Sequence, residues 1–445
     1  MKIKLHTITQ RVLMLALLLA VASSASAYDF MVDGIAYDFA STDSTAVQVV
    51  PISKTEYYTG DIVVPATVEH DGKSYNVTAI GMHAFVFCSG MTSIELPSSI
   101  KTIEPGAFMN CYGLTSIDLP EGLESIGNLA FVACENLEKV TIPSTVQDIG
   151  YMAFNMNTKL RNITIPEGVE VIEYMTFSSC HALKDVVLPQ SLKAIGAQAF
   201  SNCKQFSMVV IPDAVVEIGN EAFSNCENVT EVTIGKGVKN IGSNAFNGCE
   251  RMEVVKWNAV ECDDHDGDFQ SPFKSHGDTF AVEIGSGVQK IPAQLFNYAY
   301  ELKSVDIPAS VKEIGNNAFE NCLSLSTIVS RNPDPNLISY GSDIESIFNG
   351  VKKEKCVVWV PAGSIDVYKA TMPWSQFEDF REIVEGDIDC DGAITAADVM
   401  MQYNRVLNSD YSQPATCDVD GDGEVTAADI TAIYNILLGN GSTED

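Results

Sequence analysis

A segment of about two dozen residues recurs along most of this chain, with its clearest copy at Ile195-Gly196-Ala197-Gln198-Ala199-Phe200-Ser201-Asn202-Cys203. A fixed period of this length, with one apolar strand per copy, predicts a solenoid whose coils bury their apolar faces only against neighbouring coils. The central phenylalanine recurs every 23 residues and then continues after a four-residue insertion: Phe85, Phe108, Phe131, Phe154, Phe177, Phe200, Phe223 and Phe246, then Phe273, Phe296 and Phe319.

Each copy also contains a run with strand periodicity, as in residues 137–143, where Val140 and Ile142 alternate with Lys139 and Thr141. The run ends in proline, which cannot donate a hydrogen bond to a sheet. We therefore predict a parallel strand ladder on one face, with the phenylalanines in the core. The outward strand positions are candidates for a binding surface: Glu138, Lys139, Thr141, Arg161, Asn162, Thr164, Lys184, Asp185, Val187, Thr230, Glu231 and Thr233.

The first 79 residues precede the repeats and divide into two parts. Residues 1–27 have a basic flank, a short apolar run and a small-residue site at Ala25-Ser26-Ala27, which predicts a secretory signal peptide. Residues 28–79 alternate strand-like runs with the turns Asp33-Gly34 and Asp71-Gly72, which predicts an N-terminal β cap over the open end of the solenoid.

The charge balance restricts the partners that the chain can bind. The sequence has 59 Asp and Glu against 27 Lys and Arg, and its formal net charge is −32. Such a chain repels nucleic acids and anionic lipids. After the signal, no apolar stretch is long enough for a transmembrane segment. We expect an exported protein, either secreted or surface-attached.

A column of cysteines follows the phenylalanines. Disulfides are one interpretation in an exported chain. Equivalent side chains on adjacent coils point the same way, however, and Asn157 and Ala299 stand in this column. We therefore favour small buried thiols over disulfides, and consider a zinc site less favoured still because no Cys-x-x-Cys unit is present. The column comprises Cys88, Cys111, Cys134, Cys180, Cys203, Cys226, Cys249 and Cys322.

The Ile-Gly-x-x-Ala-Phe-x-x-Cys and Val-x-Ile-Pro units resemble the BspA-like class of leucine-rich repeats over residues 80–384. The resemblance implies a β-rich leucine-rich-repeat solenoid with a non-catalytic role in adhesion or in binding proteins or host-matrix components. Residues 364–383 contain several aromatic residues, and we interpret them as a cap over the last coil. The alternative is a sugar-binding aromatic surface.

An acidic insertion at residues 263–268 interrupts the repeats and contains Asp263, Asp264, Asp266 and Asp268. A cation site and a solvated loop are both possible interpretations. We favour the loop because the acids lack the spacing and the turn glycine of a calcium site.

Two calcium loops follow residue 385. The first has acids at positions 1, 3, 5 and 12 and a glycine at position 6, and the second repeats this spacing 31 residues later. Position 7 contributes a backbone carbonyl in such loops. The predicted ligands of two Ca²⁺ ions are Asp387, Asp389, Asp391, Ala393 and Asp398, with Asp418, Asp420, Asp422, Glu424 and Asp429.

Each loop continues into one helix, and the two copies match residue by residue. This duplicated unit resembles a type I dockerin over residues 385–445, which implies two structural calcium ions and a cohesin partner on a scaffold or surface protein. By the same resemblance, Ala396, Ala397, Ala427 and Ala428 at loop positions 10 and 11 would contact the cohesin. We expect a small helical core of Val399, Tyr403, Leu407, Ile430, Tyr434 and Leu438, and a disulfide between Cys390 and Cys417 stays open.

Three functions follow from these features. The first is a secreted, non-catalytic binding or adhesion protein that is tethered by its dockerin. The second is an enzyme acting on polysaccharide or peptide, because dockerins often carry catalytic domains. No nucleophile elbow and no His-Glu-x-x-His motif is present, so we favour the first. The third is a structural spacer.

Overall fold

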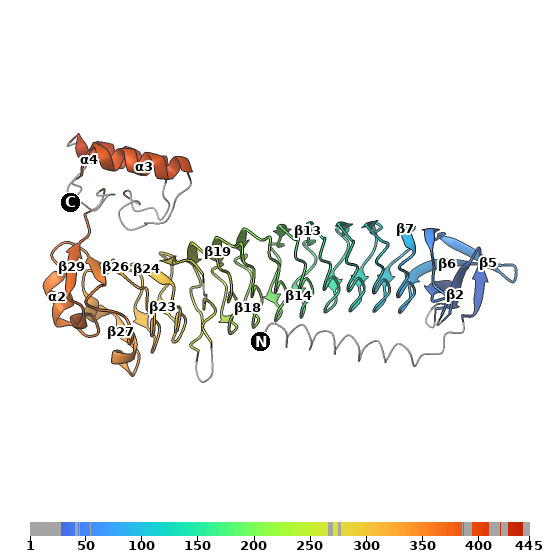
Figure 1. Ribbon diagram of the computed structural model, residues 1–445, viewed down its shortest axis with the longest axis horizontal. Coiled ribbons are helices and arrows are strands. Elements are labelled where there is room, and N and C mark those ends of the chain that lie inside the picture. Colours follow the sequence, from blue (N-terminus) through green and yellow to red (C-terminus); the bar gives the residue numbers. More distant parts are fainter. Residues whose placement is uncertain are drawn as a thin grey trace. The chain divides into compact units, whose positions relative to one another are not determined.

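In the computed structural model, the described residues are 28–384 without 41–42, 44, 54, 266–269 and 275–276, together with 386, 394–408, 419 and 426–438. The expected signal peptide lies outside these residues. The chain divides into two compact units, and Figure 1 labels their helices and strands. The first comprises residues 1–192 and 199–204, and the second comprises residues 193–198 and 205–445.

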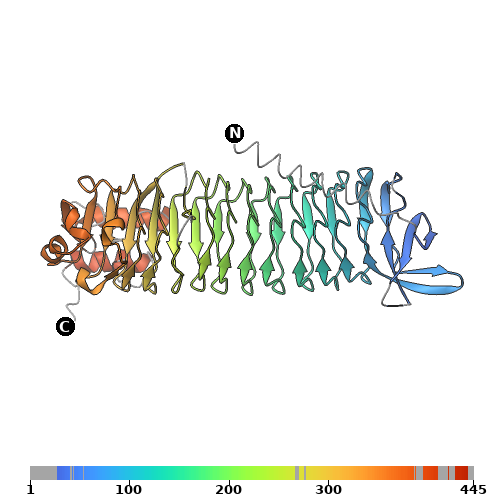
Figure 2. The same ribbon diagram turned by 90° about the horizontal axis from the view of Figure 1, so that it is seen from below.

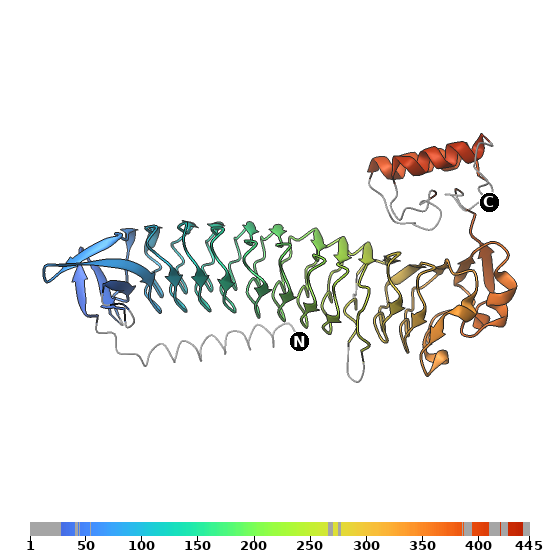
Figure 3. The same cartoon turned by 180° about the vertical axis from the view of Figure 1, so that it is seen from behind.

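The first unit begins with two β-hairpins, drawn in blue in Figure 3. Strands β1 (Phe30–Val32) and β2 (Ile35–Phe39) are antiparallel, as are β5 (Thr67–His70) and β6 (Lys73–Ile80). Both connecting turns have two residues with positive φ, at Asp33-Gly34 and Asp71-Gly72. Positive φ at both turn residues matches the twist of the flanking strands, and it confirms the turns predicted from the sequence.

The hairpins join the first coil through hydrogen bonds and through ring packing. Strand β3 (Ala46–Val50) pairs with β2 and, in parallel, with β6, which pairs in turn with the first short strand of the repeats. Strand β4 (Gly60–Val63) pairs with β7 (Met91–Glu95). The ring of Tyr58 lies 4.9 Å from that of Phe85, measured between centroids. The hairpins therefore cover the start of the aromatic column.

Each coil of the first unit contributes two parallel strands. The long strands match the predicted ladder and are β9 (Ser116–Asp118), β11 (Lys139–Thr141), β13 (Asn162–Thr164) and β15 (Asp185–Val187). A second ladder of two-residue strands, which the sequence analysis missed, ends at the isoleucine before the turn. It comprises β8 (Thr102–Ile103), β10 (Ser125–Ile126) and β12 (Asp148–Ile149), and β14 (Val171–Ile172) has the same position in its coil.

The second unit repeats this pattern (Figure 2). Its long ladder is β17 (Met208–Val210), β19 (Glu231–Ile234), β21 (Val254–Trp257), β22 (Phe280–Ile284), β24 (Leu302–Ile307), β26 (Thr327–Ser330), β28 (Val357–Val360) and β29 (Asp379–Glu382). The short strands form two groups, namely β16 (Ala194–Ile195), β18 (Glu217–Ile218) and β20 (Asn240–Ile241), and then β23 (Lys290–Ile291), β25 (Glu313–Ile314) and β27 (Ser339–Tyr340).

The phenylalanines form a stacked column in the core of each unit. Neighbouring rings lie 4.9 to 5.5 Å apart between centroids, from Phe85 to Phe200 in the first unit and from Phe223 to Phe348 in the second. Burial of such large apolar rings is the main favourable contribution to folding. Phe348 extends the column by one coil beyond Phe319.

The ten described cysteines are free thiols. In the repeats, the Sγ atom hydrogen-bonds to the carbonyl oxygen of the phenylalanine one coil earlier, for example from Cys134 to Phe108 over 3.0 Å. Asn157 takes this place in its own coil, where its Nδ2 atom donates to the carbonyl of Phe131 over 3.0 Å. The column therefore satisfies buried backbone carbonyls. Cys390 and Cys417 lie outside the described residues.

Buried aromatic residues close the last coil of the repeats. Trp374 and Phe377 pack on Phe348 at 5.3 Å between centroids, and Tyr368 donates a hydrogen bond to the carbonyl of Asn332 over 2.7 Å. These rings are almost fully buried, which supports the cap interpretation. This part contains η1 (Pro335–Leu337), η2 (Ile344–Ser346), α2 (Ile365–Ala370) and η3 (Trp374–Gln376). Among the described residues, no helix has the length and apolar character of a membrane span.

Candidate ligand-binding face and calcium module

The long strands of the first unit present an exposed polar face. Lys139 and Asn162 are neighbours in register, and an ion pair of 3.3 Å joins Glu138 to Arg161 at the edge of the same strands. The side chain of Asp185 lies outside the described part. The other predicted positions of this unit are exposed: Glu138, Lys139, Thr141, Arg161, Asn162, Thr164, Lys184 and Val187.

In the second unit this face is more buried and carries a row of charges. The predicted residues Thr230, Glu231 and Thr233 are half-buried. The strands that follow continue the row with Lys256, Glu283 and Asp306, which are successive partners in register. The sequence analysis did not include these three, although they have the same strand periodicity.

Two ion pairs flank the centre of this row. Lys256 contacts Glu231 at 3.0 Å, and Arg331 contacts Asp306 with Nε at 3.0 Å and Nη2 at 3.1 Å. Only 7% of Asp306 is exposed. Burial raises the pKa of Asp306, and the guanidinium of Arg331 opposes this effect.

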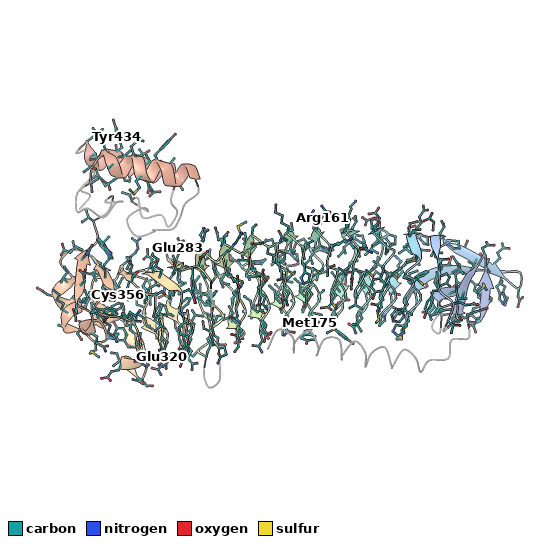
Figure 4. All side chains as sticks on the ribbon, viewed as in Figure 1. Arg161, Met175, Glu283, Glu320, Cys356 and Tyr434 are labelled. Atoms are coloured by element: carbon teal, nitrogen blue, oxygen red, sulfur yellow. The ribbon has the colours of Figure 1, made fainter. Side chains whose placement is uncertain are left out.

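Glu283 lies between these pairs (Figure 4). Its Oε1 atom is buried and accepts no hydrogen bond. Burial raises the pKa of Glu283 to about 7; Lys256 opposes the rise, whereas Asp306 and Glu231 add to it. The row therefore contains a carboxyl group that can change its charge near neutral pH.

The acidic insertion contributes an ion pair. Asp264 contacts Lys290 at 2.6 Å and accepts a hydrogen bond from the backbone N–H of Ala293 over 2.8 Å. Asp266 and Asp268 lie outside the described residues. In the part of the chain that is described, no three His, Cys, Asp or Glu side chains are grouped to hold a metal ion.

The C-terminal module contains α3 (Ala396–Asn408) and α4 (Ala427–Leu437). The last predicted ligand of each loop is fully buried at the start of its helix. Asp398 accepts a hydrogen bond from the backbone N–H of Thr395 over 2.7 Å, and Asp429 accepts one from Thr426 over 2.6 Å. The threonine hydroxyls accept from the N–H groups of Ala397 and Ala428, both over 3.1 Å. Both helix starts therefore have the same hydrogen-bonded geometry.

The other predicted metal ligands, Asp387, Asp389, Asp391, Ala393, Asp418, Asp420, Asp422 and Glu424, lie outside the described residues. The predicted partner contacts are described and exposed, in the first turn of each helix: Ala396, Ala397, Ala427 and Ala428. The alanine pairs of the two helices are thus both accessible.

The prediction of which residues form the helical core of this module is partly wrong. Ile433 is fully buried and packs against Ile394, Val399 and Val419. In contrast, Tyr403, Tyr434 and Leu438 have exposed fractions of 50%, 54% and 56%. Asp429 and Ile433, four residues apart, lie on the inner face of α4, and Tyr434, one position after Ile433, is turned outward.

Comparisons with known proteins agree with this organisation. The sequence matches the family model described as BspA type Leucine rich repeat region, in six copies, over residues 78–207, 148–261 and 270–344. It also matches the model described as Dockerin type I domain over residues 385–438. No curated protein matches the sequence.

Two solved structures illustrate the structural similarity. A leucine-rich repeat protein from Bacteroides ovatus is 25% identical, with 80% of this chain and 100% of that chain covered and a TM-score of 0.48. A leucine rich cell surface protein from Faecalibacterium prausnitzii is 23% identical, with 82% and 97% covered and a TM-score of 0.46.

Proposed function

This chain belongs to the BspA-type leucine-rich-repeat family and carries a type I dockerin domain, and we propose that it is a secreted, non-catalytic binding protein of a bacterium. The repeats bind a protein or glycan ligand, and the dockerin tethers the chain to a cohesin of a scaffold or cell-surface protein. The proposal divides the chain into a signal peptide (1–27), a β cap (28–79), repeats with their C-terminal cap (80–384) and a dockerin (385–445).

The exposed strand face is the observation that carries the binding proposal. Its side chains, such as Lys139, Asn162 and Thr164, are exposed although they are held in register on a rigid ladder. A rigid surface loses little conformational entropy on binding. Its polar and charged groups would recognise a polar ligand surface by hydrogen bonds and ion pairs.

Type I dockerins bind calcium, and the described residues fit this role. Asp398 and Asp429 are buried carboxylates at equivalent places, each at the end of an acidic loop. We propose two Ca²⁺ ions, one per loop, held by the predicted oxygen ligands. When bound, each ion would neutralise carboxylates that otherwise repel one another.

A binding screen of the mature chain tests the role of the repeats. We would probe matrix proteins and a glycan array with the wild type, with Lys139→Glu on the strand face, and with Lys101→Glu as a matched control beside the short strands. We expect a bound partner whose affinity falls about tenfold with Lys139→Glu only. Absence of any partner would favour the spacer, and hydrolysis of a polysaccharide or peptide would favour the enzyme.

A second experiment tests the tether with a panel of immobilised cohesins in calcium buffer. Because the two helix starts are equivalent, we expect Ala397→Arg or Ala428→Arg alone to leave binding intact. The double variant should abolish it, as should a chelator. Binding that persists in the double variant would place the cohesin contact elsewhere.

A further inference from the structure

Two residue columns flank the stacked phenylalanines, one two positions before each ring and one directly after it. In the first unit these columns mix apolar side chains with polar ones such as Asn155 and Ser178. The apolar ones form a buried cluster separate from the aromatic column, and the cluster comprises Val86, Met109, Leu129, Val132, Met152 and Met175. Around these six residues, apolar packing therefore fills the space beside the turns.

In the second unit the same two columns are polar in every coil, including the last two of the repeats. They place Asn317 and Glu320 on one coil, and Ser346 and Asn349 on the next. These residues line a depression of about 680 Å³, together with Lys353 and with Gln376 of the C-terminal cap. Glu320 lies on the opposite side of the unit from Glu283 (Figure 4), so the depression is separate from the strand face.

Hydrogen bonds hold the lining of this depression in place. The carboxylate of Glu320 accepts from Nδ2 of Asn317 over 2.6 Å and from Nδ2 of Asn349 over 2.9 Å. Ser346 donates to the carbonyl of Asp343 over 2.6 Å and accepts from the backbone N–H of Asn317 over 3.2 Å. The two amide groups are thus fixed, and each also carries an oxygen that accepts hydrogen bonds.

The lining selects among classes of ligand. Glu320, Asp343 and Glu345 outnumber the single cation Lys353, so the depression disfavours anions. An apolar ligand would leave its polar groups unpaired, because Met372 is the one apolar side chain in the described lining. A cationic ligand would meet Lys353, and the Glu320 carboxylate is already engaged by two amides. An uncharged ligand with many hydroxyl groups matches this mixture of donors and acceptors.

We propose that the depression lined by Asn317, Glu320, Asn349, Lys353 and Gln376 binds a neutral saccharide unit of a glycan. The amides and the ammonium group donate to sugar oxygens, and the amide oxygens accept from sugar hydroxyls. This inference rests on the proposed binding role of the repeats and adds a second site, away from the strand face.

The test measures binding of the full mature chain to neutral gluco-, xylo-, manno- and galacto-oligosaccharides by calorimetry, with spermidine as a cationic probe. Asn349→Ala should weaken oligosaccharide binding at least about tenfold. Asn247→Ala, at the equivalent column position of another coil, is the matched control and should change it less than about twofold. Gln376→Ala, which lies outside the coils, gives a second variant should Asn349→Ala disturb folding.

The outcomes separate this inference from the proposed function. Sugar binding that is lost in the two pocket variants but retained in Lys139→Glu and Asn247→Ala supports the saccharide site. Three outcomes would overturn the saccharide site: no oligosaccharide binds, the pocket variants bind with the same affinity as the wild type, or spermidine binds in preference to the oligosaccharides. A partner that depends on Lys139 would sustain the strand-face proposal in each of those cases.

Discussion

At the scale of single residues, two columns support each other. The phenylalanine rings stack. The cysteine that follows each phenylalanine by three residues donates a hydrogen bond to the backbone carbonyl of the phenylalanine in the preceding coil, as Cys180 does to Phe154 over 3.2 Å. Asn157 makes the same contact with an amide. This explains why the column accepts Cys or Asn, and it gives the cysteines a structural role that requires no disulfide.

Truncating a ring inside the column should be costly. Phe131→Ala should lower the free energy of unfolding by about 3–5 kcal/mol, because a fully buried ring is replaced by a cavity. Tyr112→Ala, at an exposed ring of the same unit, is the control and should change stability by less than about 1 kcal/mol. Chemical denaturation measures the free energy of unfolding of both variants. If both substitutions had similarly small effects, the aromatic column would not be a main source of stability.

The thiols should be unreactive while the protein is folded. Burial raises the pKa of Cys180 and of Cys249 to about 12, so both remain protonated at neutral pH. We expect iodoacetamide to modify them only after denaturation without reductant, as measured by mass spectrometry. Disulfides between adjacent coils would show that successive coils are not stacked with their cysteine side chains pointing the same way.

At the scale of the element, the ladders depend on close approach of successive coils. An added Cβ atom at Gly150 would lie 2.4 Å from Oδ1 and 2.5 Å from the backbone nitrogen of Asn128, which explains the glycine after isoleucine. The same stacking brings outward side chains within reach of each other. In the second unit it places Glu283 between two ion pairs and buries its Oε1 atom.

The charge row should make stability depend on pH. The pKa of Glu283 rises from 4.5 to about 7 on folding, so the folded state binds the proton more tightly. Its contribution is fully present below about pH 4.5 and is lost as the pH rises through about 7. Glu283→Gln should remove this loss, which we expect to be on the order of 1–3 kcal/mol between about pH 5 and pH 8.

Denaturation of the wild type and of Glu283→Gln at several pH values measures this difference. Glu217→Gln, an exposed carboxyl on β18, is the control and should follow the wild type. If the free energies of unfolding of the wild type and of Glu283→Gln changed with pH in parallel, the carboxyl of Glu283 would be hydrated rather than buried.

At the scale of the whole molecule, acidic charge is concentrated in the C-terminal segment. Residues 386–445 contain twelve acidic residues and one basic residue, Arg405. A module with so small an apolar core should depend on bound calcium, because binding energy contributes directly to folding. Calcium should therefore control the helices and the tether, whereas the repeats fold on their aromatic columns.

Calcium titration of the full chain should reveal two sites. Asp398→Ala should remove one and Asp429→Ala the other, as measured by calorimetry, while the unfolding transition of the repeats stays unchanged. These carboxylates also accept hydrogen bonds at the helix starts, so Thr395→Ala and Thr426→Ala serve as controls. The controls should cost about 1 kcal/mol of helix stability and still bind calcium. If the double variant Asp398→Ala, Asp429→Ala still bound two calcium ions, the assignment of these residues as ligands would be wrong.

The sequence by itself determined the features that repeat locally. The period predicted the coils, alternation predicted the long strands, and the turns at Asp33-Gly34 and Asp71-Gly72 followed from residues that tolerate positive φ. The duplicated acidic segments likewise predicted the two helices that begin beside Asp398 and Asp429. Each of these follows from the conformational preferences of a few neighbouring residues.

Only the tertiary structure decided what surrounds each side chain. It placed Tyr434 outside and Ile433 inside α4, joined the short strands into a second ladder, and set the partly buried carboxyl of Glu283 in a row of charges. It also showed that columns beside the phenylalanines are packed around Met175 but open around Glu320. Burial depends on atoms contributed by other coils and helices, and these contacts are set by packing in three dimensions rather than by spacing along the chain.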